Sequence, residues 1–459
     1  MTSPTDLVVV LPGILGSTLR HRGKLVWSPS ARSAVQAVKT FGGSIRDLLL
    51  PDDIGDDHPG DGVEPDGLMP DLHALPGIWT PVKGYDRLIG RLRSLGYREP
   101  TDDATPGNLI LFPYDWRLSN RYNARRLATV IEPALHRWRE QGGRFADAQA
   151  VLVCHSMGGL IARWYVEHCG GAETTRKVVT FGTPYRGAAK ALEQLVNGVR
   201  RGVGPIGLDL TALVRSMPSM YQLLPEYACL EHDGGLAKTT EITVPELSTS
   251  KIADGMRFHT ELAQAESHRQ ASLTTTHAII GIQQPTSTTA RLSGRRVEMV
   301  ETYQTENLYG DATVPIVAAT RADVPMDSPL LRRVPDQHGN LQRNPAALDE
   351  LEGILTARPI DVRAPYSVDL RVDIPDLALA GEQLLVDVAT ADGRPHSVRI
   401  TVTDENNRIV DSRVTQVPAG ARVTAVLDDQ PPGAYAIAVS GISPSSPLAP
   451  VNGDVLIWG

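Results

Sequence analysis

A serine between small residues is the feature of this sequence with the clearest chemical potential. Residues 151–165 read VLVCHSMGGLIARWY, so an apolar run leads directly into His155 and Ser156. An amphipathic helical pattern follows over residues 157–168. This order of strand, sharp turn and helix is that of a nucleophile elbow, which raises a serine hydroxyl above the edge of a sheet. Cys154 stands where the first glycine of G-x-S-x-G is usual, but it is still a small residue.

A serine hydroxyl is a weak nucleophile, so it needs a base to take its proton and an acid to orient that base. In enzymes with this elbow the chain order is serine, acid, histidine. Asp311 lies in LYGDATVP directly after a strand pattern and is the expected acid, with Asp323 and Asp336 as rivals. Only His338 and His396 follow Asp311. His396 falls among the C-terminal strands, which leaves His338 in DQHGN as the expected base.

The oxyanion formed during acyl transfer needs fixed backbone N–H donors. Met157 follows the serine directly and is the first expected donor. The second is expected from the glycine-containing loop PGILGS at residues 12–17, where the backbone can approach a substrate carbonyl. Ile14 is the candidate there, and its neighbours Gly13 and Leu15 remain alternatives.

Strand-like and helix-like apolar patterns alternate along the chain, and they predict the elements that position these side chains. The predicted strands are 6–11, 109–112, 150–154, 177–181 and 277–282, with a further strand signal at 297–303. The predicted helices are 85–95, 120–141, 157–168 and 344–357. Such alternation is typical of a mostly parallel sheet with helices on both faces.

The alternation is interrupted over residues 188–272, where helical pieces carry apolar clusters such as MPSMYQLL. An insertion of this length is more than a loop and predicts a helical cap or lid over the carboxyl edge of the sheet. An added helical layer with no gating role is the alternative. An acidic loop at residues 52–57 does not fit a calcium-binding pattern and is expected to be a solvated loop.

From residue 361 onward the apolar residues alternate with period two. The predicted strands are 367–374, 383–390, 397–403, 408–415, 422–427, 435–440 and 455–458. Their number and spacing predict an all-β, immunoglobulin-like sandwich over residues 361–459, beside a catalytic domain at 1–360. The sandwich carries no evident chemistry, so its expected role is stability or contact with a partner protein.

Composition excludes several classes of function. The 459 residues have a net charge of −8 and no basic stripe interleaved with aromatics, which argues against nucleic-acid binding. Apolar runs are far shorter than the ~20 residues of a membrane span, and the first residues lack a signal-peptide pattern. A cytoplasmic location is therefore expected. The three cysteines match no metal spacing and are expected to be reduced, and no cofactor or metal is predicted.

Six motifs occur in one order along the chain: LPGILGSTL, PYDWRLS, CHSMGGLIARWY, FGTPYRGA, YGDATVP and QHGN. Together they resemble the lecithin:cholesterol acyltransferase-like family of α/β-hydrolases, which includes phospholipid:diacylglycerol acyltransferases and lysosomal phospholipases. The resemblance covers residues 6–357 and none of the C-terminal region. It implies the same nucleophile, acid, base and oxyanion donors as above, an α/β-hydrolase fold, a mobile lid and lipid esters as substrates. Asp115 and Arg117 of PYDWRLS are expected to brace their loop rather than react.

The leading hypothesis is a serine esterase or lipase that cleaves carboxylic esters, with acyl lipids as the first class to test. Two alternatives remain open: transfer of the acyl group to an alcohol acceptor, and a non-catalytic binding or scaffold protein on the same fold. Transient contact with a membrane surface is also left open, although no basic amphipathic helix supports it directly. The signal and disulfide pattern of secreted relatives is missing, so a lipoprotein substrate is not expected.

Overall fold

The computed structural model describes residues 4–28, 47–70, 84–101, 105–201, 208–269, 274–356, 368–392, 394–406, 408–442 and 448–458. Its centre is a six-stranded sheet in the order β17-β12-β7-β6-β1-β5, in which every neighbouring pair is parallel. The strands are β1 (Leu7–Leu11), β5 (Leu109–Leu111), β6 (Ala150–His155), β7 (Thr175–Phe181), β12 (Thr275–Gly281) and β17 (Leu331–Val334). All five residues of β1, LVVVL, are buried, as expected for a parallel strand that is covered on both faces.

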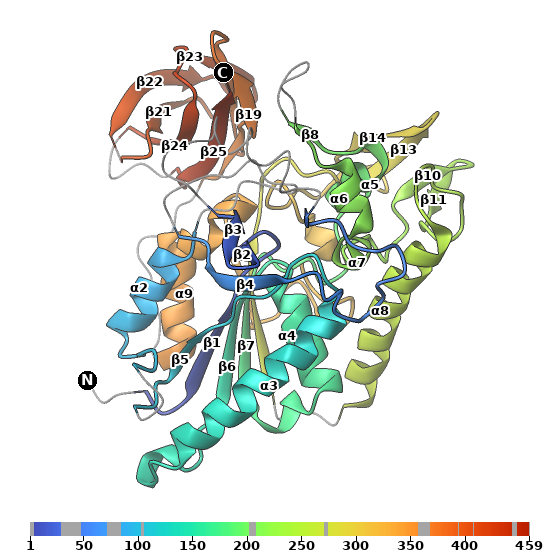
Figure 1. The fold of residues 1–459 in the computed structure, drawn as a ribbon. Coiled ribbons are helices and arrows are strands. Elements are labelled where there is room, and N and C mark those ends of the chain that lie inside the picture. The colour runs from blue at the N-terminus through green and yellow to red at the C-terminus, as the bar shows by residue number, and fades with distance from the viewer. Residues whose placement is uncertain are drawn as a thin grey trace.

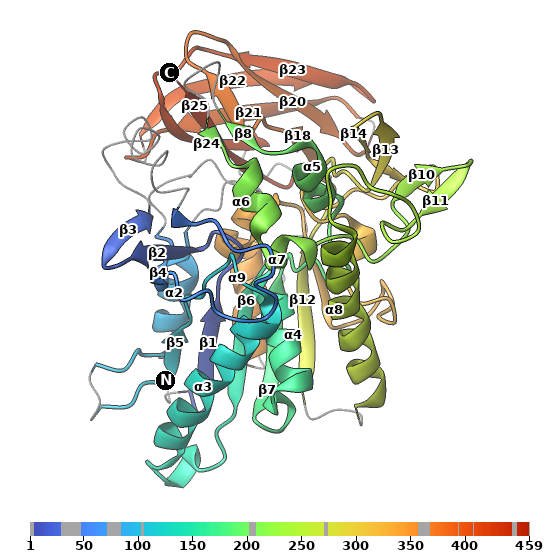
Figure 2. The same ribbon diagram turned by 45° about the vertical axis from the view of Figure 1, so that its right-hand side comes forward.

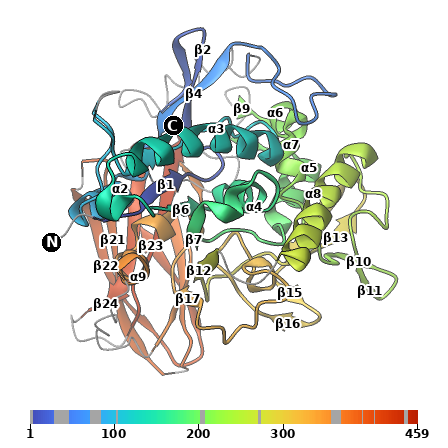
Figure 3. The same cartoon turned by 90° about the horizontal axis from the view of Figure 1, so that it is seen from below.

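Helices cover both faces of this sheet (Figure 3). On one face lie α3 (Asn120–Arg139) and α4 (Gly158–His168), which pack on each other and on β1. On the other face lie α2 (Asp86–Ser94) and α9 (Pro345–Thr356), and α9 contacts β12 and β17. The prediction of a mostly parallel sheet between two helical layers is confirmed.

Two strands differ from the expectation. The strand signal at 297–303 is mainly β14 (Arg296–Val300), which lies outside the central sheet and pairs with β13 (Thr289–Ser293). The last strand of the central sheet is instead β17, whose sequence LRRV carries only two apolar residues. Because β17 is the edge strand of the sheet, it has a neighbouring strand on one side alone and is less buried than the central strands. Its sequence is therefore less apolar, and the strand pattern is weak there.

Smaller elements surround the carboxyl ends of the central strands (Figures 1 and 2). A separate three-stranded sheet comes after β1 in the chain and contains β2 (Ser17–His21), β3 (Lys24–Trp27) and β4 (Val63–Leu68). The stretch 188–272 contains α5 (Ala189–Asn197), β8 (Arg200–Arg201), β9 (Leu208–Asp209), α6 (Thr211–Ser216), α7 (Pro218–Tyr221), β10 (Leu230–His232), β11 (Gly235–Ala237) and α8 (Thr249–His268). The hairpin of β15 (Thr302–Tyr303) and β16 (Glu306–Asn307) completes this region. Residues 202–207 and 270–272 of the predicted cap lie outside the described residues.

The C-terminal part consists of two β-sheets, in the orders β18-β20-β23 and β19-β25-β24-β21-β22. Their strands are β18 (Leu370–Asp373), β19 (Leu377–Leu379), β20 (Leu384–Thr390), β21 (His396–Thr403), β22 (Ile409–Val417), β23 (Arg422–Leu427), β24 (Gly433–Gly441) and β25 (Val451–Trp458). Alternate residues from both sheets form one apolar core that is separate from the core of the first part. The short β19 was not predicted. The immunoglobulin-like assignment stays a prediction, and the predicted boundary at residue 360 lies outside the described residues.

Candidate active site

Ser156 stands at the sharp turn between β6 and α4. Its φ angle is 52°, a left-handed conformation that is uncommon for a residue with a side chain and that is found in strained turns at functional sites. The turn is held from both sides: the Ser156 N–H donates to the Phe181 carbonyl at 2.8 Å, and the Thr183 hydroxyl donates to the Ser156 carbonyl at 2.9 Å. The backbone therefore has the geometry that the sequence predicts for an elbow.

Close packing explains the small residues around this turn. A Cβ atom on Gly158 would lie 2.5 Å from the carbonyl oxygen of Pro12, so the helix could not start so near the loop after β1. Cys154 occupies the position where a glycine is more usual, and its side chain is fully buried within β6. Burial raises the pKa of its thiol, which therefore stays protonated and apolar in character. The cysteine is thus a packing residue of the strand.

The structure brings Ser156, His338 and Asp311 together in one row. Nε2 of His338 lies 2.8 Å from Oγ of Ser156, and its Nδ1 lies 2.8 Å from Oδ2 of Asp311. Because a carboxylate only accepts hydrogen bonds, Nδ1 carries the proton and Nε2 of the neutral ring is free to accept the serine proton. The three side chains come from the turn after β6, the turn before Val314 and the start of the 3-10 helix His338–Arg343.

The loop around Asp311 fixes the direction of its carboxylate. Oδ1 accepts the backbone N–H groups of Thr313 at 3.0 Å and Val314 at 2.6 Å, which leaves Oδ2 for the imidazole. Gly281, at the end of β12, lies so close that a Cβ atom there would be 2.4 Å from the Asp311 Cβ. The rival Asp323 is engaged elsewhere, in a pair with Arg321 on the surface.

The two expected oxyanion donors are backbone N–H groups that make no hydrogen bond within the described part of the chain. Neither the Ile14 nor the Met157 backbone N–H has an acceptor there, and both residues are buried. By contrast, the Gly13 N–H donates to the Tyr85 hydroxyl at 2.7 Å. Gly13 is therefore already engaged, which removes one of the alternatives that the sequence left open; Leu15 has a φ of 62° in the same turn.

A buried chain of hydrogen bonds, not expected from the sequence, links this loop to the histidine loop. Nε2 of His155 lies 3.1 Å from the carbonyl oxygen of His338 and must donate to it, so Nδ1 is the acceptor. That nitrogen accepts the Tyr85 O–H at 2.9 Å, and the same Tyr85 oxygen accepts the Gly13 N–H. Burial, with a contribution from His338, lowers the pKa of His155 to about 3, so the ring is neutral as the chain requires.

The PYDWRLS motif braces the neighbouring loops. Arg117 is fully buried and pairs with Asp115 at 2.6 Å and with Asp61 at 2.9 Å. A further guanidinium N–H of Arg117 donates to the Leu48 carbonyl at 3.1 Å. Burial opposes its charge, but the two carboxylates hold its pKa above the usual value. These contacts agree with a bracing role, because none of them reaches Ser156.

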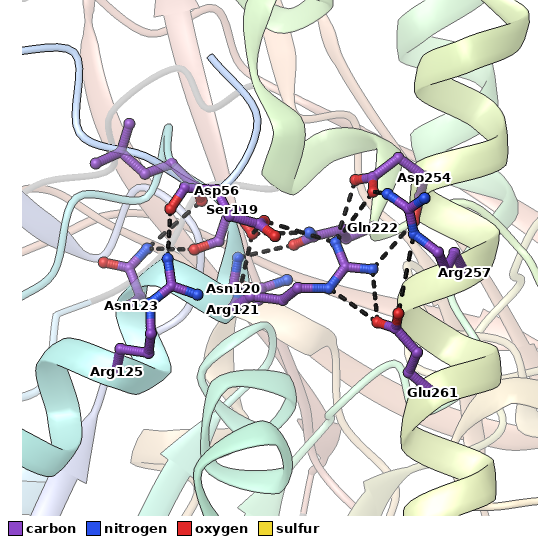
Figure 4. A network of polar contacts seen from close by, with 11 residues as sticks. Asp56, Ser119, Asn120, Arg121, Asn123, Arg125, Gln222, Asp254, Arg257 and Glu261 are labelled. Atoms are coloured by element: carbon purple, nitrogen blue, oxygen red, sulfur yellow. Dashed lines mark hydrogen bonds and ion pairs between the residues drawn. The ribbon is translucent and has the colours of Figure 1, made fainter. Parts of the chain in front are cut away.

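Ion pairs fix the long helix α8 of the cap region to α3 (Figure 4). Arg121 is 5% exposed at its side chain and pairs with Asp254 at 3.2 Å and Glu261 at 3.0 Å. Its guanidinium also lies over the ring of Trp164 on α4, at 5.0 Å. On the other side of Arg121, Asp56 of the acidic loop accepts the Ser119 hydroxyl at 2.5 Å. The acidic loop is therefore docked at this point rather than solvated along its whole length.

The three side chains of this row are covered in this conformation. Ser156 is 2% exposed, His338 is 1% exposed and Asp311 is fully buried. Over the described residues there is no group of three or more His, Cys, Asp or Glu side chains that could hold a metal ion. Within the same residues, no helix has both the length and the apolar character of a membrane span. The three cysteines are unpaired.

The parallel sheet, the helical layers and the serine elbow fit the α/β-hydrolase fold. Residues 75–287 match the model of the lecithin:cholesterol acyltransferase family, a range that includes Ser156 and ends before Asp311. The chain carries a domain of the lecithin:cholesterol acyltransferase-like family.

Curated relatives match over limited stretches. An uncharacterized protein of Saccharomyces cerevisiae is 29% identical over 181 residues, which is 39% of this chain and 23% of that protein. The human lysosomal phospholipase A and acyltransferase is 31% identical over 117 residues, 25% of this chain and 27% of that protein. The chain thus spans about a quarter of the length of these relatives. Among solved structures, Bacillus licheniformis lipase BlEst2 in its propeptide form aligns with 99% of this chain and 94% of that one, with a TM-score of 0.39 and 11% identity.

Proposed function

We propose that this protein is a serine acyl-hydrolase that cleaves carboxylic esters of acyl lipids. The observation that carries the proposal is the unbroken row from Asp311 through His338 to Ser156, with both hydrogen bonds at 2.8 Å. A lone serine in a strand-to-helix turn would not need a buried imidazole and a buried carboxylate aligned behind it. The match of residues 75–287 to the lecithin:cholesterol acyltransferase family model supports a lipid ester as the substrate.

In the proposed reaction, Oγ of Ser156 attacks the ester carbonyl carbon while Nε2 of His338 takes the hydroxyl proton. The carbonyl oxygen becomes an oxyanion that the N–H groups of Ile14 and Met157 stabilise, and Asp311 stabilises the imidazolium. The tetrahedral intermediate then collapses, the alcohol leaves with the proton from Nε2, and an acyl ester remains on Ser156. Water, deprotonated by His338, attacks this ester, releases the fatty acid and restores the serine.

Acyl transfer to an alcohol is the second candidate. Both reactions share the acyl-serine step, and they differ only in whether water or a bound alcohol takes the acyl group. The 2% exposure of Ser156 supports acyl transfer as a candidate reaction, because a covered acyl-enzyme meets little bulk water. The human relative is named as both a phospholipase and an acyltransferase.

We also propose that the C-terminal sheets form an immunoglobulin-like sandwich. The packing of a three-stranded sheet, β18-β20-β23, against a five-stranded sheet with β24 at its centre supports this arrangement. A single apolar core between the two sheets agrees with it. Its expected use in contact with a partner protein remains part of this proposal.

The test uses p-nitrophenyl esters of increasing acyl length and a fluorophosphonate label. Wild-type protein is expected to hydrolyse the esters and to incorporate the label, and Ser156→Ala is expected to do neither while remaining folded. Folded wild-type protein that is inert toward both reagents would leave the non-catalytic scaffold as the better description. Preference for short acyl chains would contradict the lipid part of the proposal, and ester products formed with added alcohol would favour transfer.

A further inference from the structure

The C-terminal sheets touch the two loops that hold Asp311 and His338, although the sequence gives them no chemical role. The first contact is made by Gln284, which is fully buried. Its side-chain amide donates to the Leu370 carbonyl at 3.3 Å and accepts the Val372 N–H at 3.4 Å. The amide therefore pairs with β18 as the backbone of an adjacent strand would, and the two bonds together fix its orientation.

The backbone of the same residue is joined to the acid loop. The Gln284 N–H donates to the Gly310 carbonyl at 2.9 Å, and the Gly310 N–H donates back to the Gln284 carbonyl at 3.1 Å. Gly310 is the residue directly before Asp311. Next to it, the Arg371 guanidinium of β18 lies over the Tyr309 ring at 4.3 Å, a cation–π contact. Gln284 thus links β18, through its side chain, to Gly310, through its backbone, and Gly310 is bonded directly to Asp311.

The second contact reaches the histidine loop through Asp336, which is fully buried. Its carboxylate accepts the backbone N–H of Asn452 in β25 at 3.2 Å. The other donors belong to the histidine loop itself: the Gln337 N–H at 2.8 Å, and the side-chain amides of Asn344 at 2.6 Å and of Asn340. One carboxylate therefore ties a C-terminal strand to the segment on either side of His338.

A third contact lies between these two. The Gln337 side-chain amide donates to the Val372 carbonyl at 3.4 Å, so the residue directly before His338 also reaches β18. The two loops that orient the imidazole are consequently held by two neighbouring strands, β18 and β25. A displacement of these strands would be transmitted to both loops together.

We propose that the C-terminal domain is a structural part of the active site and that Gln284 and Asp336 are positioning residues, which align Asp311 and His338 with Ser156. The inference rests on the proposed serine mechanism. General-base catalysis requires hydrogen-bond geometry to be held within a fraction of an ångström, and a misplacement of about 1 Å costs roughly 100-fold in rate. Hydrogen bonds that hold the acid and histidine loops in place affect the rate of serine acylation and leave substrate affinity largely unchanged.

The test uses the full chain with Gln284→Met, which keeps the volume of the side chain and its backbone bonds but removes both contacts with β18. Gln430→Met is the matched control, because Gln430 is also buried, lies in the C-terminal domain and, among the described residues, donates only to the nearby Asp428 carbonyl. The rate constant of labelling by a fluorophosphonate is measured together with kcat, KM and thermal unfolding. Gln284→Glu, which keeps the acceptor for the Val372 N–H, tests for partial rescue.

We expect Gln284→Met to slow labelling and to lower kcat by about 10-fold or more, with KM nearly unchanged and the protein folded at the assay temperature. Gln284→Glu should be intermediate, and Gln430→Met should label at the wild-type rate. Wild-type labelling rates in folded Gln284→Met would overturn the inference while leaving the proposed function intact. An inert wild type would instead overturn the proposed function. If Gln284→Met does not fold, Asp336→Asn decides the question by the same criteria.

Discussion

Nε2 of His155 donates a hydrogen bond to the backbone carbonyl oxygen of His338 at 3.1 Å, although 183 residues separate them in the chain. His155 directly precedes Ser156, so this bond joins the turn that carries Ser156 to the backbone of the loop that carries the His338 imidazole. The Tyr85 hydroxyl continues the chain to the Gly13 N–H in the loop that supplies Ile14. The residues expected to attack, to move the proton and to hold the oxyanion are therefore connected below the site.

Tyr85→Phe is expected to lower kcat by about 10- to 100-fold, because the substitution leaves both the Gly13 N–H and Nδ1 of His155 without their buried partner. Each unsatisfied group costs ~1–3 kcal/mol, so the unfolding temperature should also fall. The matched control is Tyr227→Phe, in which an equally buried hydroxyl donates to the Thr288 carbonyl. That control should lose stability and keep its kcat per folded molecule. Equal kcat values for the two variants would contradict the positioning role of Tyr85.

Asp311→Asn is expected to reduce kcat on the order of 10⁴-fold without unfolding the protein, because an amide no longer holds the imidazole in the tautomer that accepts the serine proton. The comparison is Asp323→Asn, which changes the rival carboxylate in its surface pair with Arg321. Steady-state hydrolysis of a p-nitrophenyl ester measures both. Loss of activity in the second variant alone would mean that the acid is wrongly assigned.

Gly158→Ala should fail at the level of folding, since the added Cβ atom would lie 2.5 Å from the Pro12 carbonyl oxygen, which belongs to the backbone and cannot move aside. Gly90→Ala provides the contrast. Gly90 lies within α2, and a Cβ atom there meets nothing within 4 Å. This variant should be more stable than wild type by ~0.5–1 kcal/mol, from the higher helix propensity of alanine. Denaturant unfolding and the soluble yield distinguish the two outcomes.

Stability is expected to fall when the pH is lowered from about 6.5 toward 4. Burial lowers the pKa of His155 to about 3 and that of His259 to about 4, whereas both rings titrate near 6.5 in the unfolded chain. The unfolded chain then binds more protons in this window, so each histidine lowers the free energy of unfolding by about 2 kcal/mol at pH 5. Asp336 offsets part of this loss, because burial raises the pKa of its carboxyl and the folded state takes up that proton first.

The measurement is urea unfolding at pH 7.5 and pH 5. His259→Gln removes one of the buried titrations and should flatten the difference between the two pH values. His136→Gln is the control, since this histidine is 74% exposed at its side chain. The explanation would be wrong if both variants kept the full wild-type difference.

Helix α8 is expected to be a fixed part of the cap region. Arg121→Met removes the buried cation between Asp254 and Glu261, and amide exchange within α8 should become about 10- to 100-fold faster. Arg257→Met removes a cation that pairs with the same two carboxylates but is 64% exposed. Because exposed pairs contribute ~0–1 kcal/mol, its exchange rates should stay close to those of wild type. Fast exchange of α8 in the wild-type protein would show that the helix moves freely.

The sequence was informative where the signal is local. The strand before Ser156 and the helix after it are contiguous in the chain, and the acid and base candidates are restricted by their order. The strand β17 was missed because its LRRV pattern is only half apolar. The contacts of Tyr85, Gln284 and Asp336 could not be predicted, since an amide, a hydroxyl or a carboxylate gives no sign in sequence of a partner 70 or more residues away.

The contact between Asp336 and Asn452 spans 116 residues, and this separation has a consequence for biosynthesis. A chain that grows from its N-terminus contains Ser156, Asp311 and His338 well before it contains β25. The nascent protein therefore holds a complete set of reacting groups whose acid and base loops still lack their outer support. Under the proposed function, we expect full esterase activity only once the C-terminal strands have emerged and folded, and little acylation of the serine while the ribosome is still translating.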